Sequence, residues 1–169
     1  MDNKVIQKLS YGMYVIGAMD GDRPVGCFVN TVVQITSEGP MLLVSLNKQN
    51  ETHAVVSRTG KFSVSIISEA TPPLVIGTFG FFSSRDRNKF EGFRTTTLAG
   101  LPCVDEKTCG ALACEVVSQN DAGTHTVFLA RVTDAKALSG AGSTPMTYAY
   151  YHNVIKGRAP KTAPTYAED

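Results

Sequence analysis

The amino-acid sequence predicts a mainly β protein, an antiparallel barrel or sandwich with a few short helices. Six segments have the β-branched, apolar or alternating patterns of strands, whereas only three short segments have helical spacing or capping residues. Strands do not alternate with long helices, so a doubly wound parallel sheet is not expected. A chain of 169 residues suffices for one domain with its own buried core.

Strand signals recur along most of the chain. They are clearest where β-branched and apolar residues follow one another or alternate with small polar residues. The expected strands cover residues 14–18, 25–36, 41–46, 62–67, 111–117 and 126–132. The last two flank residues 120–123, Asn-Asp-Ala-Gly, a turn-forming run that predicts a β-hairpin.

Helical signals are few and short. Residues 5–9 space their apolar side chains as a helix does, after an aspartate that is a good N-cap. Residues 50–57 form a second candidate, which Gly60 would close. Residues 71–79 begin with Thr-Pro-Pro, a capping side chain followed by prolines that suit the first turn.

Composition and charge exclude several classes of protein. Sixteen Lys and Arg against fifteen Asp and Glu leave a net charge of +1, which argues against nucleic-acid binding. No run of 18 apolar residues and no secretory signal are found, so we expect no membrane span and a cytoplasmic protein. The cysteines contain no CxxC pair, which predicts reduced, buried thiols and no metal site. They are Cys27, Cys103, Cys109 and Cys114.

The densest polar cluster is residues 45–53, which follow a predicted strand and enter a predicted helix. Free N–H groups at a helix start attract an anion, and Lys48 adds a full positive charge. Ser45 and Thr52 can donate hydrogen bonds to phosphate oxygens. The pattern therefore suits a phosphate, although a polar surface loop in which Asn50 caps the helix explains it equally well.

Neither GxGxxG after a strand nor GxxxxGK[ST] occurs, so a Rossmann site or P-loop is not supported.

Two further clusters could contact a ligand. In residues 79–90, aromatic side chains are followed by serines, arginines and a lysine. The aromatic rings could pack against a planar ligand while the cations reach a phosphate. A loop anchored to the core by its aromatic residues is the alternative. In residues 26–31, Gly26 permits close backbone approach, whereas Asn30 and Thr31 are polar within an apolar strand. They need a partner, either a ligand edge or a neighbouring strand.

Taken in order, these clusters resemble the flavin reductase-like, FMN-binding split-barrel family. The matching patterns are Gly-Cys-x-x-Asn-Thr at 26–31, Val-Ser-Leu-Asn-Lys-x-Asn-x-Thr-His at 44–53 and Phe-Gly-Phe-x-Ser-x-Arg-Asp-x-x-Lys-Phe at 79–90. The closing residues 148–166 are similar to the branch that contains flavoredoxin-like proteins and the flavin domain of high-molecular-weight rubredoxins. The resemblance covers about residues 5–166.

The resemblance implies an antiparallel Greek-key split β-barrel that binds FMN as a homodimer. Residues 1–155 would form the barrel domain and residues 156–169 an extended tail. The flavin ring would be lined by residues 30–32. The ribityl chain and phosphate would be held by residues 45–48 and 52, and the phosphate side would be completed by residues 83, 85 and 89. The implied cofactor contacts are Cys27, Asn30, Thr31, Val32, Ser45, Leu46, Asn47, Lys48, Thr52, Ser83, Arg85 and Lys89.

His125 matches a family position that is associated with the nicotinamide cofactor. The family motif is Gly-Asp-His-Thr, whereas this chain has Gly-Thr-His-Thr, so Thr124 replaces the carboxylate. The resemblance implies an NAD(P)H:FMN oxidoreductase in which hydride passes to FMN near His125 and electrons pass on to an acceptor. The alternative is an electron-transfer flavoprotein that partners a rubredoxin or a diiron flavoprotein and has no nicotinamide chemistry of its own.

Overall fold

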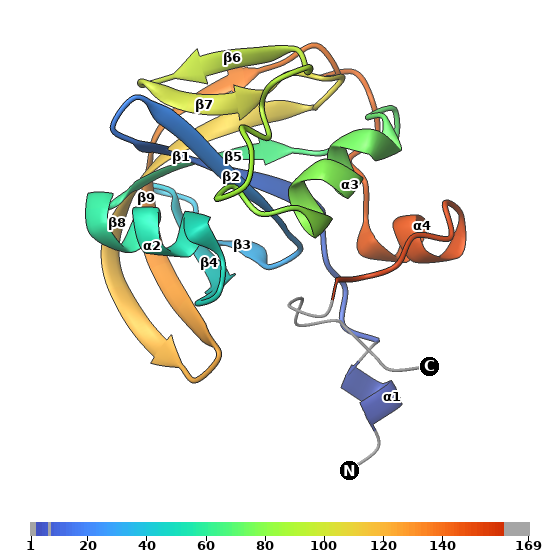
Figure 1. Ribbon diagram of the computed structural model, residues 1–169. Coiled ribbons are helices and arrows are strands. Elements are labelled where there is room, and N and C mark those ends of the chain that lie inside the picture. The colour runs from blue at the N-terminus through green and yellow to red at the C-terminus, as the bar shows by residue number, and fades with distance from the viewer. Residues whose placement is uncertain (1–2, 7, 161–169) are drawn as a thin grey trace.

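The computed structural model describes residues 3–6 and 8–160 (Figure 1). Within them, no helix is long and apolar enough to cross a lipid bilayer. The elements are α1 (Asn3–Ile6), β1 (Tyr14–Asp20), β2 (Arg23–Val29), β3 (Val32–Thr36), β4 (Met41–Asn47), α2 (Glu51–Thr59), β5 (Lys61–Ile66), α3 (Pro73–Phe81), β6 (Thr95–Leu98), β7 (Leu101–Val104), β8 (Gly110–Ala122), β9 (His125–Ala137) and α4 (Tyr148–Asn153).

Seven strands form one antiparallel sheet in the order β2-β1-β5-β8-β9-β4-β3. The edge strands β2 and β3 are nevertheless separated in the chain by only Asn30 and Thr31. In a flat sheet, six spacings of ~4.8 Å would put the two edges roughly 29 Å apart. The chain from Val29 to Val32 reaches at most about 11 Å. The sheet must therefore curl until its edges meet, which confirms the predicted antiparallel barrel and leaves a seam between β2 and β3 (Figure 1).

Helices and a second hairpin cover the curled sheet. α2 connects β4 to β5, which are not neighbours in the sheet, as a Greek-key crossover does. It packs against β1, β2 and β4, whereas α3 packs against β2 and the β6–β7 hairpin lies over β1 and β5. One apolar cluster fills the barrel around Ile16, Phe62 and Phe128, and a second joins α3 and α4 to the barrel around Phe79 and Met146.

The helix predicted over residues 50–57 is present as α2. It ends where predicted, because Gly60 adopts a left-handed φ of 68° and its N–H donates to the Val56 carbonyl at 2.9 Å. α3 begins at Pro73 after Pro72, so the predicted cap at Thr71 is wrong. The Thr71 hydroxyl instead accepts a hydrogen bond from the Ser68 N–H at 3.1 Å.

Other boundaries differ from the prediction because long-range pairing decides them. The single strand predicted over residues 25–36 is broken at residues 30 and 31, where the chain passes from one sheet edge to the other. The hairpin strands β8 and β9 have 13 residues each, and the turn lies at residues 123–124 instead of 120–123. β6, β7 and α4 were not predicted. The cap residue Asp2 lies outside the described residues.

Candidate functional site

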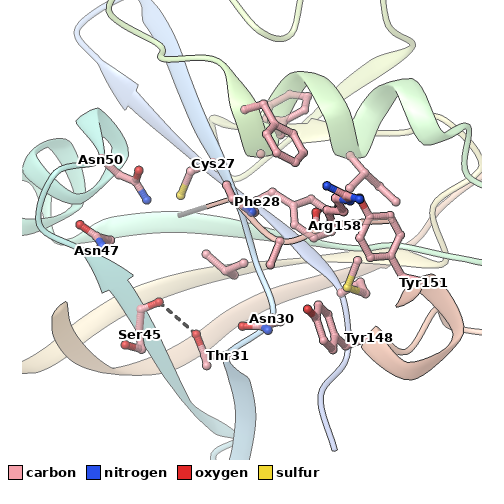
Figure 2. Close-up of a pocket in the computed structure, with 18 of the residues that line it drawn as sticks. Cys27, Phe28, Asn30, Thr31, Ser45, Asn47, Asn50, Tyr148, Tyr151 and Arg158 are labelled. Atoms are coloured by element: carbon pink, nitrogen blue, oxygen red, sulfur yellow. Dashed lines mark hydrogen bonds between the residues drawn. The ribbon is translucent and has the colours of Figure 1, made fainter. Parts of the chain in front are cut away.

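A pocket opens beside the seam between β2 and β3. It encloses about 710 Å³, including the part open to solvent, which falls within the roughly 300–1,000 Å³ of small-molecule sites. Residues of the seam, the end of β4, the start of α2, α3 and α4 line it (Figure 2). Among the predicted site residues, those that line it are Cys27, Asn30, Thr31, Ser45, Asn47, Lys89 and His125.

One side of the pocket is polar, and we call it the amide rim: Asn30, Thr31, Ser45, Asn47 and Asn50. The seam supplies the first two, the end of β4 the next two, and the residue before α2 the last (Figure 2). The Thr31 hydroxyl donates to the Ser45 carbonyl at 3.1 Å, and the Ser45 N–H donates to the Thr31 carbonyl at 3.2 Å. These two bonds fix the seam against β4, so the rim presents neutral donors and acceptors in a set geometry.

Asn50 was predicted as a possible helix cap but was not among the predicted site residues. It occupies the N-cap position of α2, yet its side chain makes no capping hydrogen bond and lines the pocket instead (Figure 2). The sequence signal for this role was present, because Asn50 belongs to the polar cluster at residues 45–53. Spacing alone could not separate a cap from a ligand contact.

Five aromatic residues also line the pocket, and we call them the aromatic wall: Phe28, Phe81, Phe82, Tyr148 and Tyr151. β2 supplies the first, the end of α3 and the residue after it supply the next two, and α4 supplies the tyrosines. Such rings offer apolar faces on which a planar ligand can stack. The tyrosines were not predicted as site residues, although the run of tyrosines at residues 148–151 was visible in the sequence.

Residues 158–160 also line the pocket, next to α4. The Gly157 N–H donates to the Tyr151 carbonyl at 3.0 Å, and the Tyr151 hydroxyl donates to the Arg158 carbonyl at 3.3 Å. A Cβ atom at Gly157 would overlap the Tyr151 ring, so a glycine lets the chain pass close to it. The domain boundary at residue 155 stays a prediction, and residues 161–169 lie outside the described part of the chain.

A buried thiol, Cys27, and a buried lysine, Lys89, both line the pocket. Lys89 is 3% exposed, and its Nζ donates to the carbonyls of Phe79 at 3.1 Å and Phe82 at 2.9 Å. Burial lowers the pKa of Lys89, while the charge of an ionised Cys27 would raise that pKa. Burial raises the pKa of the Cys27 thiol, which the Lys89 charge and a hydrogen bond with Thr52 oppose. Cys27 therefore stays a neutral thiol beside a cation.

The loop that carries Lys89 is fastened to β2. The Ser84 hydroxyl bonds both the N–H and the carbonyl of Gly26, each at 3.1 Å. Arg23 donates to the Ser84 carbonyl at 2.9 Å. Glu51, in the first turn of α2, bonds Arg23 at 2.9 Å and Arg85 at 2.8 Å. These contacts hold the loop, and with it Lys89, against the barrel.

His125 begins β9 opposite Asn47 of β4 and lines the pocket. Its Nδ1 lies 2.9 Å from the Thr124 hydroxyl, so this hydroxyl contacts the ring where the family motif has a carboxylate. His53 does not line the pocket: its Nε2 lies 2.7 Å from the Thr126 hydroxyl, and its ring packs edge-on against Phe128.

The remaining predicted site residues do not line the pocket. Leu46 and Thr52 are buried in the core, at 1% exposure each. Lys48 is exposed and its Nζ lies 2.8 Å from both carboxylate oxygens of Asp121, which lowers the pKa of Asp121. Arg85 is held by Glu51. The full set outside the lining is Val32, Leu46, Lys48, Thr52, Ser83 and Arg85.

Comparison with known proteins places the chain in a family. Residues 6–155 match the Flavin reductase like domain. The chain is 44% identical over 167 residues to the high molecular weight rubredoxin of Moorella thermoacetica, covering 98% of this chain and 72% of that protein. It is 39% identical over 169 residues to the ferric-chelate reductase (NAD(P)H) of Archaeoglobus fulgidus, covering 99% of each.

Solved structures show the same fold. The NADH:FAD oxidoreductase of Streptomyces globisporus superposes with a TM-score of 0.76 at 20% identity, covering 86% of this chain and 85% of that one. The styrene monooxygenase flavin reductase of Pseudomonas putida S12 superposes with a TM-score of 0.72 at 24% identity, covering 86% and 91%. Together with the sequence matches, they establish that the chain belongs to the flavin reductase-like domain family and is an oxidoreductase of that family.

Proposed function

We propose that the chain binds FMN in this pocket, accepts hydride from NAD(P)H and passes the electrons to an acceptor. The observation that carries the proposal is the combination of the amide rim, the aromatic wall and His125 on the lining of one pocket. A flavin is a planar ring system with hydrogen-bonding atoms along one edge and an apolar edge opposite. The residues present fit that group, because amides and hydroxyls can bond the polar edge while aromatic rings pack on the apolar part.

A bound flavin supplies the redox chemistry: it takes up a hydride, that is two electrons and one proton, and gains one negative charge. The chain supplies binding and orientation. The rim side chains orient the ring, the wall excludes water, and His125 contacts the nicotinamide. The Thr124 hydroxyl, 2.9 Å from Nδ1, orients the His125 ring on the lining of the pocket.

We assign the phosphate of FMN to the start of α2, beyond the amide rim. The N–H groups at a helix start attract an anion, and Lys48 lies two residues before Asn50. Arg85 is held beside the same helix turn through Glu51. Because Lys48 is paired with Asp121 on the protein surface, phosphate binding requires Lys48 to exchange a carboxylate for a phosphate.

We also propose a homodimer. The edge strand β3 exposes Val33 and Ile35 at 58% and 49%. α1 extends away from the barrel, and Val5, Ile6 and Leu9 in and after it are exposed at 67%, 47% and 59% (Figure 1). A second copy would bury these apolar side chains. Light scattering on the purified chain should give twice the mass of 18.1 kDa, and a monomeric mass would contradict this proposal.

A second candidate function is electron transfer without nicotinamide chemistry. The specific support is the 44% identity to a protein named high molecular weight rubredoxin. In this version the flavin exchanges electrons with a rubredoxin or a diiron flavoprotein. Thr124, which replaces the carboxylate of the family motif beside His125, is consistent with it.

One experiment tests both functions. The purified chain is titrated with FMN and with FAD, and the loaded protein is mixed anaerobically with NADH and with NADPH. Bleaching of the flavin absorbance by either reductant is the expected result. If neither reductant bleaches the flavin but added reduced rubredoxin does, electron transfer is the function. A chain that takes up neither flavin contradicts both.

A further inference from the structure

We infer that Lys89 stabilises the negative charge that the bound flavin gains on reduction, and that it thereby raises the reduction potential of the flavin. This inference rests on the proposed flavin binding. The resemblance to the family put Lys89 with the phosphate contacts Ser83 and Arg85. The structure separates it from them, because Lys89 lines the pocket next to Cys27 and the other two residues do not.

Lys89 differs from the other cations near the pocket in its burial. It is the one lysine or arginine in the buried class among the residues whose burial is described. Its ammonium group has three donors, of which two are used by the carbonyls of Phe79 and Phe82. The third remains for a group in the pocket. A charge in this setting acts on its neighbours through protein and not through water, so its effect on them is strong.

Lys89 also differs in its partners. Lys48 is paired with Asp121 and Arg85 with Glu51, and both pairs are solvent-exposed, so solvent weakens their charge. In the described part of the chain, no ion pair joins Lys89 to a carboxylate. Two titratable groups act on it: Cys27, a thiol that burial keeps neutral, and Arg87, whose charge lowers the pKa of Lys89.

A buried cation without a counterion favours whichever ligand state is more negative. An oxidised flavin ring is neutral and the hydride-reduced ring carries one negative charge, so Lys89 binds the reduced state more tightly. Every tenfold difference in affinity between the two states corresponds to about 30 mV in the two-electron potential.

The test uses the FMN-loaded protein and the variant Lys89→Gln. Glutamine keeps N–H donors for the Phe79 and Phe82 carbonyls but removes the charge. The midpoint potential is measured by spectroelectrochemistry, and the affinities for oxidised FMN and riboflavin are measured by fluorescence titration. We expect the variant's preference for reduced over oxidised flavin to fall at least tenfold, which lowers the midpoint potential by about 30 mV. Oxidised FMN and riboflavin should both bind within threefold of their wild-type affinities.

Three comparisons make the outcome decisive. Lys61→Gln removes an exposed charge on β5, paired with Glu115, and should leave the potential unchanged. Lys89→Arg keeps the charge and should retain the wild-type potential. Lys89→Met replaces Lys89→Gln if the latter does not fold, with the same expected shift.

Two results would overturn the inference. One is an unchanged potential in Lys89→Gln or Lys89→Met. The other is a loss of FMN affinity of tenfold or more with riboflavin affinity intact, which would make Lys89 a phosphate anchor. Failure of the wild-type chain to bind any flavin would instead refute the proposed function, so the two failures are distinguishable.

Discussion

The two sides of the pocket are built by different means. The amide rim comes from the ends of strands and the start of α2. Two hydrogen bonds between the seam and β4, one main-chain and one from the Thr31 hydroxyl, hold it in place. The aromatic wall comes mostly from α3, α4 and the residue after α3, which reach the barrel through the apolar cluster around Phe79. The rim is therefore fixed by the sheet, whereas the wall depends on side-chain packing between distant segments.

This difference predicts how substitutions divide between stability and binding. Changes in the rim other than at Thr31 should alter ligand affinity with little effect on folding, because the two hydrogen bonds between the seam and β4 remain. Changes beneath the wall should alter both, because the same apolar contacts hold the helices and shape the pocket. Substitutions on the two sides of the pocket test this difference, and the largest effect is expected beneath the wall.

Phe79→Ala should remove the packing that supports the aromatic wall and should destabilise the fold. Phe79 is 1% exposed and packs edge-on against Phe90 with ring centroids 4.9 Å apart. Removing its ring should lower the free energy of unfolding by about 3–5 kcal/mol, measured by urea denaturation. The matched control is Phe81→Ala, which removes a pocket-lining ring that is 53% exposed and should cost much less. Equal losses in the two variants would contradict the packing argument.

Lys48→Ala tests whether the anion site extends beyond the rim. Loss of a charge-assisted contact should weaken FMN binding by about 1.5–3 kcal/mol and leave riboflavin binding unchanged. Folding should barely change, because the pair with Asp121 is exposed. Asp121→Asn provides the opposite test: it releases Lys48 and should tighten FMN binding. If Lys48→Ala binds FMN as wild type does, Lys48 is not a phosphate contact.

Asn50→Ala should separate binding from folding within the rim. A lost hydrogen bond to the ligand should weaken flavin binding by about 0.5–1.5 kcal/mol. Helix stability should hardly change, because the Asn50 side chain does not cap α2. The comparison is Thr147→Ala in α4, where the side chain accepts from the Tyr150 N–H at 3.1 Å and its loss should cost about 1 kcal/mol of stability. A large stability loss in Asn50→Ala would show that Asn50 is a structural cap.

The smallest expected effect concerns the pH dependence of stability through His53, which contacts Thr126 and Phe128. Burial, followed by the charges of Lys48 and His125, lowers the pKa of His53 below its usual 6.5. The folded protein then binds this proton less readily than the unfolded chain, so stability falls as the pH drops below about 6.5 and levels off below the folded pKa. Urea unfolding at several pH values should show less of this loss in His53→Gln than in wild type.

The sequence predicted the fold class and much of the rim for a local reason. The alternation of residues 62–67 and the β-branched residues 25–36 indicate strands, and this information lies within each segment. The helix over residues 50–57 and its end at Gly60 follow from equally local rules. Asn30, Thr31, Ser45 and Asn47 could be identified for the same reason, since they interrupt or end apolar strands.

The wall could not be found in this way. Tyr148, Tyr151 and Arg158 lie far along the chain from Phe28, and only folding brings them to one pocket. The sequence also could not show that Lys48 faces a surface carboxylate while Lys89 is buried, because both lysines stand in polar, basic segments. Burial of a cation depends on what packs over it, here the end of α3 and β2.

Signals within a few residues therefore identified most of the strands, the principal helix stop and the polar residues at strand ends, because these features depend on near neighbours in the chain. The tertiary structure alone decided where the curled sheet leaves its seam, which aromatic residues line the same pocket as the amide rim, and which lysine is withdrawn from water. Those features depend on contacts between segments tens of residues apart, and such contacts form only when the sheet closes.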